Sequence, residues 1–295
     1  MEHLKGKQLK ETRRNKIRDS RAFHAVNYVL LALIILICIL PFFNVLAKSL
    51  STYGETVGIW PVDFTWFNYE YVFTTWPYFR AFFVSVGVTV GGTVLSVAIM
   101  FAAAYALSKP DLPFRKGLMV FFIIVMLFSG GIVPNFFVVR MLGILNTPFA
   151  LVLPSLVQVY NMILLKSYLE GVPKEIEESA VIDGAGNLQA MVYILLPIAV
   201  PSVASVALFT AVTYWNNYFS ALIYLPNASQ WWPLAMYILN YINTMPDVLG
   251  DQTLLLQKTY IEAAMIIVSI IPVLAVYPFV AKYFVKGVTV GSVKG

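Results

Sequence analysis

Residues 81–108 read AFFVSVGVTVGGTVLSVAIMFAAAYALS and lie between Arg80 and Lys109 without a single Asp, Glu, Lys or Arg. As a helix, this stretch of 28 residues would be about 42 Å long at 1.5 Å per residue, against the ~30 Å hydrocarbon core of a bilayer. Helices of soluble domains average about 11 residues. The stretch therefore predicts a helix that crosses a membrane.

The composition of the whole chain also indicates a protein that is surrounded by lipid. Of 295 residues, 59% are hydrophobic and only 12% are charged, which leaves too few polar residues to cover a soluble protein of this size. The predicted fold is an all-α membrane protein with six transmembrane helices. The other five apolar stretches, each expected to hold one spanning helix, are residues 25–47, 117–139, 148–165, 194–225 and 263–281.

Basic residues are distributed unevenly between the two sides of such a fold. Because cytoplasmic loops of membrane proteins carry the excess of Lys and Arg, the richer side is predicted to be cytoplasmic, together with both termini. A basic segment beside a spanning helix is also expected to contact lipid headgroups rather than nucleic acid. The richer side holds Lys5, Lys7, Lys10, Arg13, Arg14, Lys16, Arg18, Arg21, Lys109, Arg115, Lys116, Lys166, Lys174, Lys282, Lys286 and Lys294, and the other side holds Lys48, Arg80, Arg140 and Lys258.

The chain is expected to form one membrane domain. We predict a basic cytoplasmic segment at 1–24, a six-helix transmembrane domain at 25–286 and a cytoplasmic tail at 287–295. Within the third stretch, Ser129, Gly130 and Gly131 predict a break, since adjacent glycines weaken a helix. We interpret this break as a hinge, with an ordinary kink as the alternative.

Several kinds of chemistry are absent from the sequence. There is no Gly-x4-Gly-Lys-Ser/Thr loop for nucleotide phosphates. Two histidines, His3 and His24, and the single Cys38 give neither a metal-ligand spacing nor a catalytic triad. An enzyme embedded in the membrane is therefore disfavoured. A self-contained secondary transporter is disfavoured too, because no Asp or Glu lies well inside a predicted span and Glu262 is expected at a boundary.

The longest loop on the predicted cytoplasmic side, about residues 166–193, is acidic where such loops are usually basic. Residues 173–197 read PKEIEESAVIDGAGNLQAMVYILLP. Pro173 fits a first helical position, and acidic residues follow it where the helix dipole favours them. Ala180 and Gly184 are four residues apart and are expected to share a face on which another protein could approach closely. The alternative is a solvated amphipathic helix at the membrane surface.

This loop resembles the signature loop of permease subunits of bacterial ABC importers, Glu-Ala-Ala, three residues, Gly, nine residues, Ile-x-Leu-Pro. Ser179 in place of the middle Ala is the single departure. Two further segments are similar to the carbohydrate branch of the family, and in particular to its smaller, maltose-type subunit and to a subgroup for complex, sometimes uronate-containing, oligosaccharides. The matching residues are Glu178, Ala180, Gly184, Ile194, Leu196 and Pro197 in the loop, Ile182–Ala185 within it, 215–217, and 288–295.

The resemblance implies a multi-subunit importer with a coupling helix between the fourth and fifth spans. Its other parts would be a second permease subunit, an ATPase dimer that binds ATP and Mg, and an extracytoplasmic solute-binding protein, in the cytoplasmic membrane of a bacterium. This chain would then bind no cofactor and would not be an enzyme. Coupling to the ATPase would rest on Glu178, Ala180, Asp183 and Gly184, with the tail around Lys294 as a further contact.

The expected substrate is an oligosaccharide, with a non-sugar solute as the alternative. Sugars present apolar faces edged with hydroxyls, so their path requires aromatic rings and amide or hydroxyl partners. Hydrogen bonding between packed helices is the alternative role for each such residue. The candidate residues are Tyr214, Trp215, Asn216, Asn217 and Tyr218 in the fifth span, and Gln158, Tyr160 and Asn161 in the fourth.

Overall fold

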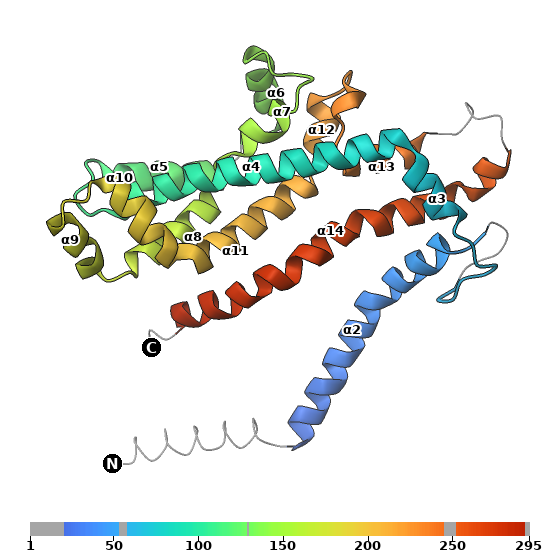
Figure 1. Cartoon of the computed structure of the whole chain (residues 1–295), viewed down its shortest axis with the longest axis horizontal. Coiled ribbons are helices and arrows are strands. Elements are labelled where there is room, and N and C mark those ends of the chain that lie inside the picture. Colours follow the sequence, from blue (N-terminus) through green and yellow to red (C-terminus); the bar gives the residue numbers. More distant parts are fainter. Residues whose placement is uncertain (1–20, 53–57, 129, 245–251, 293–295) are drawn as a thin grey trace. The chain divides into compact units, whose positions relative to one another are not determined.

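The computed structural model of the chain describes residues 21–52, 58–128, 130–244 and 252–292 (Figure 1). Apart from one antiparallel bridge between Ser51 and Phe64, these residues contain no strand, which confirms the all-α class. Most of the predicted basic segment and Lys294 lie outside the described residues. In chain order the elements are α2 (Arg21–Ser49), α3 (Phe67–Thr74), α4 (Trp76–Ser108), α5 (Arg115–Leu127), α6 (Ile132–Met141), α7 (Phe149–Val152), η1 (Leu153–Ser155), α8 (Val159–Glu170), α9 (Lys174–Ile182), α10 (Asn187–Gln189), η2 (Ala190–Leu195), α11 (Leu196–Trp215), α12 (Phe219–Tyr224), η3 (Ser229–Trp231), α13 (Leu234–Asn243) and α14 (Gln252–Ser292).

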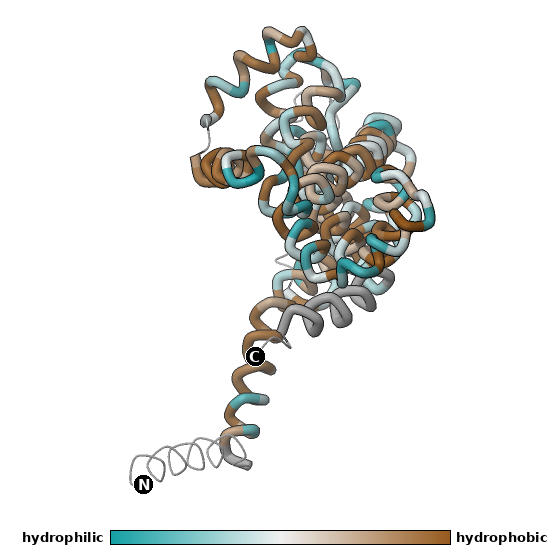
Figure 2. The backbone as a smooth tube through the Cα atoms, turned by 90° about the vertical axis from the view of Figure 1, so that its left-hand side faces the viewer, coloured by the Kyte–Doolittle hydropathy of each residue, from teal (hydrophilic) through white to brown (hydrophobic). Residues whose placement is uncertain are grey.

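Three of these helices contain a stretch that is long and apolar enough to cross a membrane: Phe23–Ser49, Trp76–Ser108 and Leu256–Pro278. Figure 2 shows hydrophobic residues along most of α2. Three further pairs of bent helices raise the number to six if each pair is one span. The membrane class is thus confirmed, and the count of six stays a prediction.

The predicted break in the third stretch is present. Helix α5 ends at Leu127 and α6 begins at Ile132, and Gly131 between them has φ +83°, a backbone conformation that favours glycine. The fourth stretch is also divided, since its two helical parts meet at an angle of 50°.

The fifth span differs from its prediction. A single helix over 194–225 is wrong, because α11 ends at Trp215 and α12 begins at Phe219. The helical segments before and after residue 199 also meet at 84°. Pro201 cannot donate a backbone hydrogen bond to the carbonyl of Pro197, which favours a bend at this point.

The last span begins earlier than the charges predicted. It covers Leu256–Pro278, so Glu262 lies within it and not at its boundary. The carboxylate is 3.6 Å from the ammonium of Lys258, one helical turn earlier. Pairing of this kind is how membrane helices usually accommodate a charged side chain.

The chain divides into two compact units, residues 1–69 with 251–267, and 70–250 with 268–295. In the first unit, a buried polar network joins the end of α2, the start of α3 and α14. The Asn68 amide donates to the backbone carbonyls of Ser49 and Ser51, each at 3.0 Å. Gln257 donates to the Ser51 carbonyl at 3.1 Å and to the Asn68 side-chain oxygen at 2.7 Å.

Replacing Gln257 with Leu is expected to destabilise this first unit. The change removes the donor to the Asn68 side-chain oxygen and one of the two donors to the Ser51 carbonyl, and an unsatisfied buried group costs ~1–3 kcal/mol. Thermal unfolding of the detergent-purified protein would measure the loss, with the exposed Leu256→Ala as the control. Equal unfolding temperatures for the two variants would contradict a stabilising role for the network.

In the second unit, α4 packs along α8 and α11 (Figure 1). Side chains from all three helices form its largest buried cluster, including Met100, Met162 and Val206. Further along α4, Gly92 lies directly against the buried ring of Tyr214. The absence of a side chain at Gly92 therefore sets how closely α4 and α11 approach.

Candidate functional site

The short helix predicted in the acidic loop is present as α9. Pro173 is its N-cap residue, with φ −56° and ψ 131°, so it precedes the first helical position rather than occupying it. Glu175 and Glu177 lie in the first turn, where the helix dipole favours negative charge. Helix α8 before it continues past Lys166 to Glu170, and helical structure after it resumes at Asn187.

The other end of α9 is terminated by Gly184, which has φ +85°. The Gly184 N–H donates to the Val181 carbonyl at 3.0 Å, and the Ala185 N–H donates to the Ala180 carbonyl at 2.9 Å. These two bonds form a Schellman motif, in which glycine is the residue that adopts the left-handed conformation at no steric cost. The signature glycine thus has a structural reason within this chain.

The predicted shared face of Ala180 and Gly184 is wrong. Helix α9 ends at Ile182, so Gly184 lies beyond it and is exposed. Ala180 is only 7% exposed, and α9 packs against the neighbouring segment η2. A small residue at position 180 therefore fits an internal contact and not an open strip.

The outer surface of α9 instead combines acidic and apolar side chains. Glu178 and Asp183 are exposed, and between them Val181 and Ile182 are 54% and 86% exposed. Large apolar side chains on the surface of a charged loop are typical of a contact surface. Neither Val181 nor Ile182 is among the predicted coupling residues, although apolar residues at the end of an acidic helix are a usable signal.

The inner side of α9 is attached to the end of α4 through Glu177. Its carboxylate accepts a hydrogen bond from the Tyr105 hydroxyl at 2.9 Å and forms an ion pair with Lys109. The Lys109 ammonium also lies over the Tyr105 ring, 4.3 Å from its centroid. Burial lowers the pKa of Lys109. The carboxylate of Glu177 acts in the opposite direction, because a nearby opposite charge favours the charged form of the lysine.

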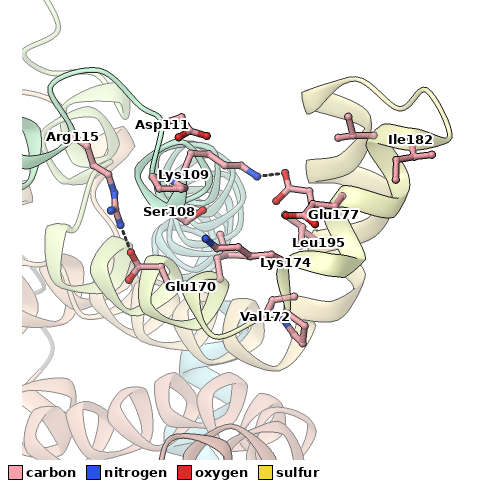
Figure 3. Close-up of a pocket in the computed structure, with 15 residues that line it drawn as sticks. Ser108, Lys109, Asp111, Arg115, Glu170, Val172, Lys174, Glu177, Ile182 and Leu195 are labelled. Atoms are coloured by element: carbon pink, nitrogen blue, oxygen red, sulfur yellow. Dashed lines mark hydrogen bonds and ion pairs between the residues drawn. The ribbon is translucent and has the colours of Figure 1, made fainter.

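A second ionic cluster joins α5 to α8. Arg115 pairs with Glu170 (Figure 3). Arg115 also donates to the Leu107 carbonyl at 2.8 Å, and Lys166 pairs with Glu170 at 2.8 Å. The two clusters border a cleft of about 670 Å³. The cleft is lined by Ser108, Lys109, Pro110, Asp111, Arg115, Leu169, Glu170, Val172, Pro173, Lys174, Glu177, Glu178, Val181, Ile182 and Leu195.

Some of the residues predicted to contact sugar are buried between helices, and others are exposed. Tyr214 is buried between helices, where its hydroxyl shares a hydrogen bond with Ser96 at 2.8 Å. The buried Asn161 amide donates to Gln158 at 2.6 Å and to Thr210 at 3.3 Å, which joins α8 to α11. In this arrangement Tyr214 and Asn161 hold helices together.

The other candidates are more accessible. Tyr160 is 63% exposed, and Tyr218 and Asn216 are exposed in or beside the break between α11 and α12. Asn217 accepts the Ser220 backbone N–H at 3.2 Å and so caps α12, whereas Trp215 packs edge-on against Phe82 at the end of α11. Tyr160, Tyr218 and Asn216 are thus the candidates whose side chains a solute could reach.

The described residues hold no group of three His, Cys, Asp or Glu side chains that could bind a metal ion. The features of the second unit that could serve a function are the exposed surface of α9 and the internal attachment of α9 to α4.

Comparison with known proteins gives close relatives over nearly the whole length. The chain is 40% identical over 285 residues to the polygalacturonan/rhamnogalacturonan transport system permease protein YtcP of Bacillus subtilis, covering 94% of this chain and 99% of that protein. It is 31% identical over 279 residues to the inner membrane ABC transporter permease protein YcjP of Escherichia coli, covering 91% and 95%. No family model matches.

A solved structure has the same fold. It is the crystal structure of a bacterial ABC transporter involved in the import of the acidic polysaccharide alginate, one chain of which is 31% identical to this one. The match has a TM-score of 0.82 and covers 90% of this chain and 98% of that chain.

Proposed function

This chain belongs to the permease subunits of bacterial ABC importers, and we propose that it carries acidic oligosaccharides or polysaccharide fragments across the cytoplasmic membrane. The observation that carries the proposal is the near full-length similarity to two polysaccharide systems, one described for polygalacturonan/rhamnogalacturonan and one for alginate. Polygalacturonan and alginate are both polymers of uronic acids. A substrate with carboxylate groups is the common chemistry.

The proposed complex contains a second permease subunit, a dimer of ATPase subunits and an extracytoplasmic solute-binding protein. The ATPase binds ATP and Mg and hydrolyses ATP, and this permease performs no hydrolysis. Both termini of the chain are cytoplasmic in this proposal, which places α9 on the same side as the ATPase. The excess of basic residues on that side supports the orientation.

The outer surface of α9 is the proposed contact with the ATPase. Exposed Glu178 and Asp183 supply charge, and Ile182 supplies an apolar side chain that a partner would remove from water. Gly184 leaves open space, since an added Cβ would meet no atom within 4 Å. Ala180 is buried and would contribute indirectly, because its small side chain allows α9 to pack against η2.

For the sugar path we propose the accessible candidates Tyr160, Asn216 and Tyr218, together with the half-buried Trp215. Aromatic rings can stack on the apolar face of a sugar ring, and the amide of Asn216 can hydrogen-bond its hydroxyls. Asn217 caps α12 and would act by placing Tyr218. The buried residues would shape the path by positioning α8 and α11.

The test is reconstitution of the complete importer in liposomes with its binding protein. We expect ATP hydrolysis to rise when the binding protein carries an oligogalacturonate or oligoalginate, and not when a neutral maltooligosaccharide of equal length is offered. Uptake of the labelled oligosaccharide into the liposomes should require ATP in their lumen, the compartment that the ATPase subunits face and that corresponds to the cytoplasm. Stimulation by a neutral sugar alone would contradict the acidic substrate, and uptake driven by an ion gradient without ATP would support a secondary transporter.

A further inference from the structure

We propose that Tyr105, Lys109 and Glu177 form a clamp that makes α9 and α4 move as one body. The inference rests on the proposed function, because the movement in question is the one that an ATPase would impose on α9. It adds an internal coupling element to the outer contact surface. In this role Glu177 and Lys109 are positioning residues that touch neither ATP nor sugar.

The orientation of Glu177 is the first support for the clamp. Its neighbours Glu175 and Glu178 are exposed, whereas Glu177 is partly buried and faces α4. The carboxylate receives two donors, the Tyr105 hydroxyl and the Lys109 ammonium. Of these two adjacent acidic residues, Glu177 thus makes contacts within the chain, and Glu178 remains available to a partner.

The geometry on α4 is the second support. Tyr105 lies in the last turn of α4, and Lys109 directly follows the helix as its C-cap residue, with φ −72° and ψ 126°. The lysine is held by the aromatic ring beneath it as well as by the carboxylate. Three groups that each contact the other two are more rigid than a single exposed ion pair, which contributes little by itself.

The connections of α9 through the backbone are less direct. On one side, Gly171, Val172 and Pro173 separate it from α8. On the other, residues 183–186 precede α10, which is followed by η2 and α11, and the chain bends by 84° near residue 199 within α11. The side-chain clamp is therefore the direct route from α9 to α4, the helix that packs along both α8 and α11.

Charge substitution in the complete importer tests the clamp. In Glu177→Gln and Lys109→Gln we expect uptake per ATP hydrolysed to fall by about five- to tenfold, at the lower end of usual coupling effects between sites. Basal ATP hydrolysis and subunit assembly should stay unchanged. The exchanged pair Lys109→Glu with Glu177→Lys should regain most of the lost coupling, because it restores an opposite-charge pair between the two positions. Two single substitutions that each damage the fold separately would not compensate each other in this way.

Arg115→Gln is the matched control, because it removes an ion pair of the same cleft that does not involve α9. Its coupling should equal that of the unmodified importer. Single variants that couple normally, or an exchanged pair that recovers nothing, would overturn the clamp. The unmodified importer decides the proposed function separately, since absence of any stimulation by loaded binding protein there would reject the function itself.

A cross-link gives a test that does not depend on the stability of the charge variants. Cysteines at positions 109 and 177, in a chain with Cys38→Ser, would be joined by a short thiol cross-linker. If α9 and α4 move as one body, the double-cysteine importer couples as poorly as the charge variants before cross-linking, and the cross-link restores its sugar-stimulated ATP hydrolysis and uptake. Loss of uptake on cross-linking, restored when the linker is cleaved, would show that the two helices must separate and would overturn the proposal.

Discussion

Replacing Gly92 with Val is expected to separate α4 from α11 and to lower the yield of folded protein in the membrane. A Cβ at this position would lie 2.9 Å from Cε2 and 3.0 Å from Cζ of the Tyr214 ring. That ring is 1% exposed and hydrogen-bonded, so it cannot move aside as a surface side chain would. Overpacking of this kind costs ~1–3 kcal/mol, which corresponds to several degrees in unfolding temperature.

The neighbouring glycine supplies the control for this prediction. An added Cβ at Gly91 meets no atom within 4 Å, so Gly91→Val should leave the unfolding temperature nearly unchanged. The measurement is thermal unfolding of the purified chain in detergent, together with its amount in the membrane fraction. Combining Gly92→Val with Tyr214→Leu should recover part of the stability, because contacting residues show non-additive effects. Equal behaviour of the Gly91 and Gly92 variants would contradict the close approach.

Gly92 and Tyr214 also show which features of the packed helices cannot be predicted from the sequence. The apolar stretch around Gly92 was sufficient to predict a spanning helix, because length and lack of charge decide that outcome. Nothing in the stretch indicates which of its three glycines meets another helix. Tyr214 was selected as a sugar contact for its chemistry, but its burial is a property of the packed helices and not of the local sequence.

The helix breaks were partly predictable. Gly130 and Gly131 mark the one between α5 and α6 because two glycines in succession are a local signal. The end of α11 at Trp215 had no comparable signal, since an apolar run with two asparagines can continue as a helix. A charged residue in the sequence predicts the boundary of a span, whereas the pairing of Glu262 with Lys258 allows Glu262 to lie inside the last one.

The clamp at Glu177 could not be derived from the sequence. Lys109 precedes Glu177 by 68 positions, and three glutamates compete for any basic partner near the start of α9. Gly184 is the opposite case. Its place two residues after Ile182 is the usual position of a helix-ending glycine, so the mistaken shared face with Ala180 could have been avoided by reading it as a terminator.

At Gly184 we expect Gly184→Arg to reduce sugar-stimulated ATP hydrolysis by more than tenfold in the reconstituted importer. Two effects contribute. A non-glycine residue with φ near +85° costs ~1–2 kcal/mol in backbone strain, and a long charged side chain would stand on the surface that we assign to the ATPase. Membrane insertion should remain normal, since the position lies outside the spans and is exposed.

Comparison of three variants separates the two effects. Gly184→Ala carries nearly the same strain as Gly184→Arg but almost no added bulk, and within this chain neither side chain meets a neighbour. Gly184→Asn relieves part of the strain, because Asn tolerates the left-handed conformation better than most residues. If a partner approaches Gly184 closely, Arg is far worse than Ala. If the glycine serves only to end α9, Arg and Ala are equally impaired and Asn exceeds both, and the contact surface would then have to exclude Gly184 and centre on Glu178 and Ile182.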